Sequence, residues 1–470
     1  MPNLGRLRAP TRFSDDSFHS RMVKQEDISF GMQDNLSRKD VTVIGGGLAG
    51  MAAAIHLAKA GLHVLCIEAT PEDNVVVGES LDWSAPELLR ALGLPMERLI
   101  AEEIATYKRH IVVSLRDGFS QQYIPSEWLG KPPWNVELRT LHVDRARLKV
   151  ALREIVLNHG VAILSDKAAE IERDRKRIIA LKTQSGRRID SPWFIDASGF
   201  AASLFPRTFK LPVHEYGPTK VAIWSYFNVP DSTEGTTLYT GEDKRQYMEW
   251  LWEIPIHQNR ISVGYVAPGA AIKEKRQQGK TVDDIYRDQL SRIPRFKPLL
   301  QATKKISPTV TSFRCRVHGE VAGPNWLVAG EAASMVDPMT SNGVTAGLRH
   351  AAEASHLIVK YFHGGRLPHL DRALYSWRVQ ALAKFFNSGI EKVIYDWPIR
   401  NRIGIVNAGE VYTVPAWSIN VLYSRLRPIG LLSTGLFNLF LASLRAAACI
   451  FHWLCSRWPA SSTSPAGSAS

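Results

Sequence analysis

Three glycines and one glutamate have the types and the spacing of a dinucleotide-binding turn. Gly45, Gly47 and Gly50 fill the glycine positions of G-x-G-x-x-G, and Glu68 follows 23 residues after Gly45. The glycines allow a tight turn, close approach of the backbone to a pyrophosphate and close helix–strand packing. An acidic side chain at the distance of Glu68 accepts hydrogen bonds from ribose hydroxyls. We therefore expect these four residues to bind a dinucleotide.

The elements predicted around the turn are those that such a site needs. An apolar run at 41–44 predicts a buried strand, 52–60 has apolar residues at helical spacing, and 63–67 predicts a second buried strand. A glycine cluster alone often makes only a turn, but this one follows a strand and opens a helix. The N-terminus of that helix would direct its N–H groups and its dipole at the phosphates. The range 40–68 is therefore predicted to be one βαβ unit.

The chain is predicted to leave this nucleotide-binding core twice and to return to it. Buried strands are expected again at 193–199 and 326–330, whereas 219–266 alternates aromatic and polar residues as an antiparallel sheet does. We predict an α/β fold, with a three-layer Rossmann-like dinucleotide-binding domain, an inserted antiparallel-sheet substrate domain and a helical C-terminal region. The predicted parts are a flexible leader (1–39), the discontinuous dinucleotide-binding domain (40–75, 140–205 and 318–365), the substrate region (76–139 and 206–317), the helical region (366–458) and a disordered tail (459–470).

Composition narrows the class of protein. The chain has 470 residues, a net charge of +13, 45% hydrophobic residues and 22% charged residues, which is typical of a globular enzyme. The positive charge favours acidic partners, but Lys and Arg are scattered, which argues against nucleic acid. The four cysteines form no CxxC pair, so we expect no metal site and no disulfide framework. A reducing compartment, the cytoplasm, is the default, and the leader lacks the apolar stretch of a secretory signal.

A second group of residues resembles the FAD-dependent monooxygenase superfamily. The segment 330–338 ends in Asp337-Pro338 and is similar to the GD…DP segment of that superfamily, with Glu331 where the family usually has Asp. The resemblance implies that Asp337 contacts the ribityl chain of FAD, and that Arg145 is the helix-opening arginine near the cofactor. A plain N-cap for Asp337 and a surface charge for Arg145 remain alternatives.

The segment Trp250-Leu-Trp252-Glu-Ile-Pro255 narrows the resemblance to the flavin-dependent halogenases, because every fixed position of their WxWxIP motif matches. In that family the tryptophans separate the flavin from the substrate, which suppresses direct oxygen insertion. Rigid rings of this size exclude water and fill space. The alternative is that Trp residues alternating along a strand simply face a core.

The same resemblance implies a lysine and a halide loop. Lys108 matches the place of the lysine that guides hypohalous acid, or carries the halogen on its amine, with Arg109 and Lys149 as rival candidates. Ser341, Asn342 and Gly343 resemble the loop that holds halide through backbone N–H groups, and Gly78-Glu-Ser80 resembles a segment near the flavin ring. Tryptophan-specific members carry a glutamate where this chain has Thr340. The resemblance therefore favours the phenol or pyrrole class.

This resemblance, which spans about 40–362, implies an enzyme that halogenates an electron-rich aromatic or enol substrate with reduced FAD, O2 and halide. Only one glycine fingerprint is present, so a separate flavin reductase is expected to supply FADH2. The net positive charge of the chain would suit an acidic carrier protein that holds the substrate. Two rivals are an FAD-dependent monooxygenase of a hydrophobic substrate and a flavin-loaded binding or assembly protein.

The range 429–455 predicts an apolar helix. Its polar residues follow helical spacings, which makes one polar stripe on an otherwise apolar surface. The uncharged run 429–444 is shorter than the roughly 20 residues that span a bilayer. A helix in the membrane surface is one interpretation. Packing against the enzyme's own core or a partner is the other, and Gly430 and Gly435 favour it.

Overall fold

The computed structural model describes residues 39–69, 77–115, 120–124, 126–132, 135, 139–230, 232, 234–242, 246–303, 306–426 and 430–457. The predicted leader, apart from Lys39, and the predicted tail lie outside the described residues. The residues from 39 onward group into one compact unit, so the boundaries between the predicted domains stay a prediction.

Five parallel strands form the sheet that carries the glycine turn. This part of the chain comprises β1 Val41–Ile44, α3 Leu48–Lys59, β2 Val64–Glu68, α7 Arg145–Asn158, β7 Ala162–Ser165, β8 Ala168–Asp174, β9 Arg177–Thr183, β10 Arg188–Asp190, β11 Trp193–Asp196, α8 Leu204–Thr208, β17 Trp326–Val328 and α12 Gly343–Tyr361. The strand order is β17-β11-β1-β2-β7. The side chains of β1 and β11 are all buried, as expected for parallel strands covered on both faces.

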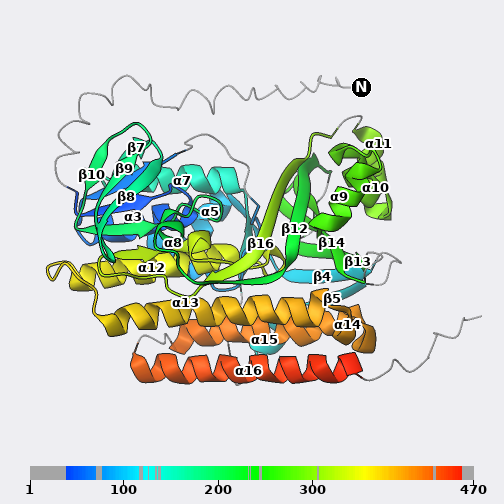
Figure 1. The fold of residues 1–470 in the computed structure, drawn as a ribbon. Coiled ribbons are helices and arrows are strands. Elements are labelled where there is room, and N and C mark those ends of the chain that lie inside the picture. Colours follow the sequence, from blue (N-terminus) through cyan, green and yellow to red (C-terminus); the bar gives the residue numbers. More distant parts are fainter. Residues whose placement is uncertain are drawn as a thin grey trace, which may run out of the picture. The chain divides into compact units, whose positions relative to one another are not determined.

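Helices and a small sheet cover these strands (Figure 1). Helix α3 packs against α12 and α7, and the antiparallel sheet β10-β9-β8 provides the remaining layer. Helix α3 begins at Leu48, earlier than predicted, because the last glycine of the fingerprint lies in its first turn. The predicted α/β class with a Rossmann-like core is confirmed.

A larger sheet of eight strands holds most of the remaining β structure. Its strands are β4 His110–Leu115, β5 Ser120–Tyr123, β12 Val213–Asn228, β13 Gly235–Glu242, β14 Met248–His257, β15 Arg260–Pro268, β16 Thr309–His318 and β18 Ser334–Met335, in the order β18-β16-β12-β15-β14-β13-β4-β5. Neighbours are antiparallel except β13 and β4, which run parallel. These two strands come from distant parts of the chain, and no hairpin fixes their relative direction.

Short elements complete this part of the chain. Strands β3 (Ala105–Lys108) and β6 (Thr140–Val143) pair with each other, and this pairing places Lys108 opposite Thr140. The remaining elements are α4 Ala85–Leu92, α5 Met96–Ala101, α6 Ser126–Leu129, α9 Gly269–Gln277, α10 Val282–Ser291, η1 Pro294–Phe296, α11 Lys297–Ala302, η2 Gly330–Ala332 and η3 Pro338–Thr340.

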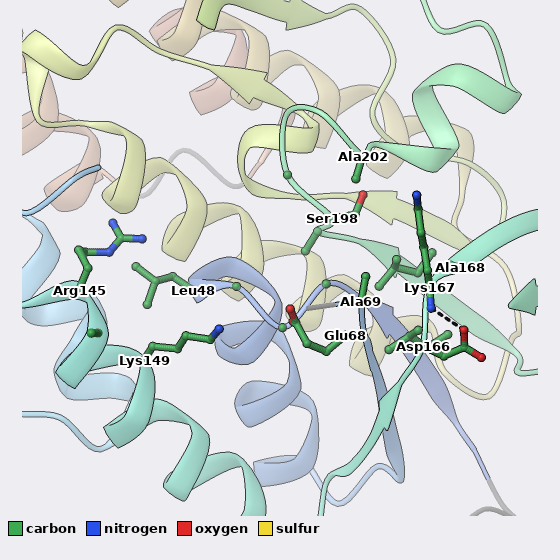
Figure 2. Close-up of a pocket in the computed structure, with 18 of the residues that line it drawn as sticks. Leu48, Glu68, Ala69, Arg145, Lys149, Asp166, Lys167, Ala168, Ser198 and Ala202 are labelled. Atoms are coloured by element: carbon green, nitrogen blue, oxygen red, sulfur yellow. Dashed lines mark hydrogen bonds between the residues drawn. The ribbon is translucent and has the colours of Figure 1, made fainter. Parts of the chain in front are cut away.

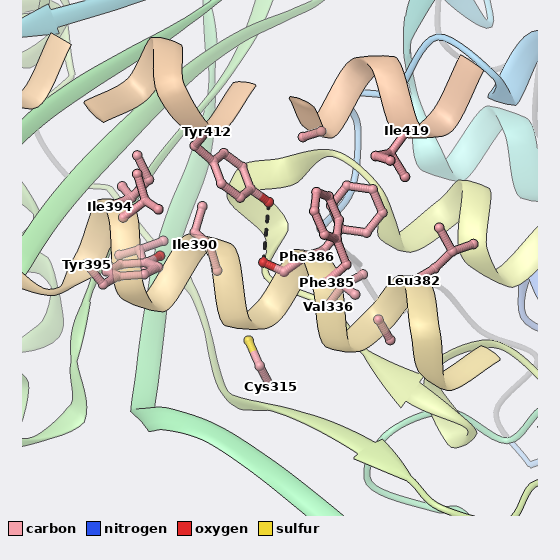
Figure 3. Close-up of a cluster of buried hydrophobic side chains, with 14 of the residues drawn as sticks. Cys315, Val336, Leu382, Phe385, Phe386, Ile390, Ile394, Tyr395, Tyr412 and Ile419 are labelled. Carbon is pink, nitrogen blue, oxygen red and sulfur yellow. Dashed lines mark hydrogen bonds between the residues drawn. The ribbon is translucent and has the colours of Figure 1, made fainter. Parts of the chain in front are cut away.

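The C-terminal part is helical, as predicted. It consists of α13 His369–Gly389, the π-helix η4 Ile390–Tyr395, α14 Trp397–Ile403, α15 Ile405–Leu426 and α16 Leu431–Arg457. A cluster of buried apolar side chains joins these helices to the large sheet (Figure 3). In it, the hydroxyl of Tyr412 donates to the carbonyl oxygen of Phe386 at 3.4 Å. The same cluster includes Trp250 and Trp252, so the helices help to fix both rings.

Candidate active site

The glycine turn lies at the carboxyl end of β1, where its three glycines meet different surroundings. Gly45 has a φ of 98°, and a Cβ there would overlap the backbone of Ala197. A Cβ on Gly50 would overlap the carbonyl oxygen of Gly45. A Cβ on Gly47 would meet no atom within 4 Å. Packing therefore requires the first and third glycines, whereas the second opens onto free space.

That space is a cavity of about 400 Å³ whose lining includes basic side chains, among them Arg145 and Lys149, as well as carboxylates such as Glu68. Figure 2 shows Arg145 and Lys149 extending from α7 toward the glycine turn, with Glu68 beside it. The Oε2 atom of Glu68 is buried and has no hydrogen-bond partner among the described residues. A buried acceptor without a partner is costly, and ribose hydroxyls would satisfy it. These features fit one of the two nucleotide halves of a dinucleotide.

A second cavity of about 400 Å³ continues from the first. The two share Gly47, Leu48 and Arg145 in their linings. The second extends past Glu79 to Gly343, the first residue of α12. Two connected cavities of this size suit the two halves of FAD, and the start of a helix favours an electron-rich edge of the ligand.

Arg145, at the junction of these cavities, interacts with two carboxylates: the buried Glu79, and Glu331, which lines the second cavity. Its Nη1 donates to the carbonyl oxygen of Gly78 at 3.1 Å. Burial lowers the pKa of Arg145, and the charges of Glu79 and Glu331 oppose that shift. Burial also raises the pKa of Glu331, which lines the second cavity. Arg145 is therefore not a solvated surface charge.

Asp337 lines neither cavity. Its Oδ1 accepts hydrogen bonds from the backbone N–H of Met339 at 3.0 Å and from the hydroxyl of Tyr395 at 3.2 Å. Its Oδ2 lies 3.3 Å from Nζ of the buried Lys220. This geometry matches the plain N-cap alternative. The ribityl contact of Asp337 stays a prediction, whereas Glu331 lines the second cavity.

Lys220 holds two carboxylates inside the protein, Asp337 and Glu391. Burial by itself would lower the pKa of Lys220, but the two carboxylates outweigh it and raise that pKa above its usual value. Its ammonium also lies 4.2 Å from the ring centroid of Tyr395. The pairing fixes the segment that leads into the predicted halide loop.

Replacing Lys220 with methionine is expected to lower the free energy of unfolding by about 3–5 kcal/mol, because two buried carboxylates would lose their cation. Urea unfolding followed by tryptophan fluorescence measures this change. Adding Glu391→Gln to the variant should restore part of the stability. A single variant within about 1 kcal/mol of the wild type would contradict the ion-pair interpretation.

Trp250 and Trp252 are neighbours on one face of β14 and are both buried. The ring nitrogen of Trp250 donates to the hydroxyl of Tyr395 at 2.8 Å, and that of Trp252 donates to Oγ of Ser262 at 3.0 Å. Both rings line the second cavity, whereas Pro255 lines neither cavity. The barrier role of the three residues stays a prediction.

Lys108 lines a third, smaller cavity of about 60 Å³. The side chain is buried at the end of β3, and its Nζ donates to the carbonyl oxygen of Leu81 at 3.0 Å. Nζ also lies 5.5 Å from the ring centroid of Trp83. Burial lowers the pKa of Lys108 to about 7, although the nearby Asp82 carboxylate opposes the shift. The rivals lie elsewhere: Arg109 is exposed and paired with Glu234, and Lys149 lines the nucleotide cavity.

The Lys108 cavity adjoins the flavin-sized cavity. The two have four lining residues in common, and neither Trp250 nor Trp252 is among them; the shared residues are Ile111, Leu238, Met339 and Ser341. The boundary is therefore made by aliphatic side chains and the predicted halide loop, with the tryptophans on the flavin side. Sequence patterns contain no signal for Ile111 or Leu238.

A buried amide ties the Lys108 cavity to the predicted halide loop. Nδ2 of Asn420, on α15, donates to Oδ2 of Asp82 at 3.0 Å and to Oδ1 of Asn342 at 2.8 Å. Ser341 has a φ of 54°, and its Oγ lies 3.1 Å from Oγ of Ser80. Asp82 and Asn420 are thus site residues that sequence reasoning missed, because Asn420 lies far from every motif.

Comparison with known proteins identifies the family to which this chain belongs. A family model described as Tryptophan halogenase matches residues 133–381, which is more than half of the chain. The chain belongs to the tryptophan halogenase family. A second model, described as Lycopene cyclase protein, matches residues 40–217, the range that holds the glycine turn.

Individual relatives have low sequence identity to this halogenase, but the alignments cover most of both chains. The tryptophan 2-halogenase of Chondromyces crocatus is 24% identical over 80% of this chain and 73% of the relative. The 1H-pyrrole-2-carbonyl-(peptidyl-carrier protein) brominase of Pseudoalteromonas luteoviolacea is 28% identical over 69% of this chain and 78% of the relative. Both are named as halogenases.

Solved structures share the fold of this halogenase. The flavin-dependent brominase Bmp2 aligns with a TM-score of 0.64 at 19% identity, over 89% of this chain and 98% of that one. The flavin-dependent halogenase CmlS aligns with a TM-score of 0.64 at 23% identity, over 76% of this chain and 64% of that one.

These findings confirm the predicted flavin-dependent halogenase family and FAD-dependent halogenation. The protein is a flavin-dependent halogenase, an oxidoreductase with FAD as its cofactor. The monooxygenase alternative is not favoured.

Proposed function

We propose that this halogenase transfers halogen from hypohalous acid to an electron-rich ring bound in the cavity around Lys108. The observation that carries the proposal is the position of Lys108: it is buried, has a lowered pKa and lines a cavity that adjoins the flavin-sized one. When bound in reduced form, FAD would supply two of the four electrons that reduce O2 and halide would supply the other two, which gives hypohalous acid and water.

FAD is proposed to lie along the two larger cavities. Gly45, Gly47 and Gly50 form the turn at the pyrophosphate, and Glu68 accepts the ribose hydroxyls. Arg145 lies between the halves, where its charge balances Glu79 and Glu331. The single glycine fingerprint supports a separate flavin reductase as the source of FADH2.

Chloride or bromide is proposed to bind at the start of α12. The first N–H groups of a helix have no partner inside it, and they carry the positive end of the dipole. In the proposed loop of Ser341, Asn342 and Gly343, Ser341 lines both cavities, and Gly343, the first residue of α12, lines the flavin-sized one. A Cβ on Gly343 would meet no atom within 4 Å, which leaves room for an anion.

Lys108 is the proposed catalytic residue. As an ammonium it would donate to the oxygen of hypohalous acid, and as a neutral amine it would carry the halogen; a pKa of about 7 permits both forms. Asp82 also lines this cavity, and we propose that its carboxylate accepts the proton that the ring loses. Halogen enters the ring, the proton leaves, and water is the second product.

The proposed substrate is a phenol or pyrrole, either free or held by an acidic carrier protein. Thr340 lines the Lys108 cavity at the position where tryptophan-specific members have a glutamate. A brominase and a chlorinase of pyrrole bound to a peptidyl carrier protein are among the relatives, and the net charge of +13 suits an acidic carrier.

Incubation of the protein with FAD, a flavin reductase, O2 and bromide tests this proposal. The substrates are a phenol, a pyrrole-2-carboxamide, the carrier-bound pyrrole acyl group and tryptophan, and mass spectrometry identifies the products. We expect brominated phenol or pyrrole and no brominated tryptophan, with reactions lacking bromide as the control. Hydroxylated products alone would instead indicate a monooxygenase.

A further inference from the structure

Four polar side chains of helix α16 face the protein. Thr434, Asn438, Arg445 and His452 follow one another at spacings of four and seven residues, and all are buried or half-buried. The Nε2 atom of His452 lies 2.7 Å from Oδ2 of Asp396. Of the polar stripe predicted from the sequence, these four residues lie on the inner face of the helix, whereas Cys449 and Ser456 are exposed.

The outer face of α16 is apolar. Leu432, Leu436, Leu439, Ile450 and Leu454 repeat at helical spacing and are exposed, with Leu439 at 64% and Ile450 at 60%. Phe440, Phe451 and Trp453 flank this row and are exposed as well. A helix on a water-exposed surface normally has the opposite arrangement. Exposed apolar patches of this kind mark interaction sites, so we define these eight residues as the α16 apolar face.

Charge indicates which partner covers the α16 apolar face. Helix α16 contains no Asp or Glu, and its only charged residues are Arg445 and Arg457. The guanidinium of Arg457 lies 4.4 Å from the ring centroid of Trp453, next to the apolar row. Trp and Arg together suit the boundary between headgroups and acyl chains, and the net charge of +13 favours anionic headgroups.

Neighbouring helices decide how α16 would meet a membrane. At 27 residues it is long enough to cross a bilayer. However, it packs along α13, which carries Asp371, Arg372 and Lys384. A spanning orientation would bring these charges toward the hydrocarbon, which is expensive. In Figure 1, α16 forms the outer edge of the helical part, so its free side is open for contact along its length.

We propose that α16 lies in the surface of a bilayer containing anionic lipids, with the α16 apolar face among the acyl chains. The inner face of α16 stays packed on α13, α14 and η4, with His452 bonded to Asp396, so the rest of the enzyme remains in water. This inference goes beyond the proposed function and does not depend on it.

Flotation of the full-length, FAD-loaded protein with vesicles tests the proposal. The vesicles are phosphatidylcholine with or without phosphatidylglycerol. We expect binding to the anionic vesicles, weaker binding without phosphatidylglycerol, and an about tenfold or greater loss of bound protein in the variant Leu439→Glu/Ile450→Glu.

The control variant is Leu157→Glu/Val213→Glu, which adds the same charge at similarly exposed apolar positions on other elements. It should bind vesicles like the wild type, and both variants should keep FAD absorbance and the thermal midpoint. A wild type that does not bind anionic vesicles, or an equal loss in both variants, overturns the proposal. If light scattering shows a dimer that only the Leu439→Glu/Ile450→Glu variant dissociates, and the wild type does not bind vesicles, the α16 apolar face is instead assigned to contact with a second copy of the chain.

Discussion

Replacing Lys108 with alanine is expected to lower the halogenation rate by about 10²–10⁴-fold while FAD still binds. The ammonium is the buried cation of the small cavity, and it lies across the shared lining residues from the flavin-sized cavity. None of the residues that line the flavin-sized cavity is substituted in this variant. Product formation by mass spectrometry measures the rate, and flavin absorbance measures the bound cofactor.

Arg109→Ala is the matched control, because it removes a neighbouring cation that is exposed and paired with Glu234. Its rate should equal that of the wild type. An Arg109→Ala effect as large as that of Lys108→Ala would mean that charge near β3, rather than Lys108 itself, governs the rate.

The pH dependence of the rate separates the two roles of Lys108. Burial lowers the pKa of Lys108 to about 7, so the ammonium predominates below pH 7 and the neutral amine above it. Hydrogen bonding to hypohalous acid requires the ammonium, and the rate would then fall as the pH rises through 7. Halogen transfer to the amine requires the neutral form, and the rate would then rise over the same range.

The second large effect is expected at the glycine turn, where Gly47→Val should weaken FAD binding at least ~100-fold, or about 3 kcal/mol. The new Cβ would meet no protein atom within 4 Å, so the variant should fold normally, but its side chain would occupy the cavity where the pyrophosphate is proposed to lie. Quenching of flavin fluorescence on binding measures the affinity.

Gly435→Val is the matched control for this variant. A Cβ at Gly435 also meets no atom within 4 Å, but this glycine lies on α16 and lines none of the three cavities. Its FAD affinity should be that of the wild type. Unchanged affinity in Gly47→Val would place the cofactor elsewhere.

Local patterns predicted the fold around the glycine turn well. Gly45, Gly47, Gly50 and Glu68 lie within one βαβ unit, where strand, turn and helix follow each other in the chain. Such contacts depend on short-range geometry, which periodicity and glycine spacing report directly. The parallel sheet and its burial followed from the same signals.

The part of the site around Lys108 and Asp337 was harder to predict, because contacts between residues far apart in the sequence determine its geometry. Asp337 carries the motif, but its carboxylate is held by Lys220 from β12, and no local signal reports that pairing. Trp250 and Trp252 match their motif, yet residues without any motif, such as Ile111, form the boundary with the Lys108 cavity. Sequence motifs indicate the class of chemistry, whereas tertiary packing determines which side chains line the site.

The most direct test concerns the passage of hypohalous acid from the flavin side to Lys108. Wild type and Lys108→Ala react with FAD, reductase, O2, bromide and the best substrate, with a small thiol in solution that traps escaping hypobromous acid. The wild type should give brominated substrate and little trapped oxidant. Lys108→Ala should give trapped oxidant at a rate close to the wild-type product rate and almost no brominated substrate. Brominated substrate from Lys108→Ala at the wild-type rate would contradict the role proposed for Lys108.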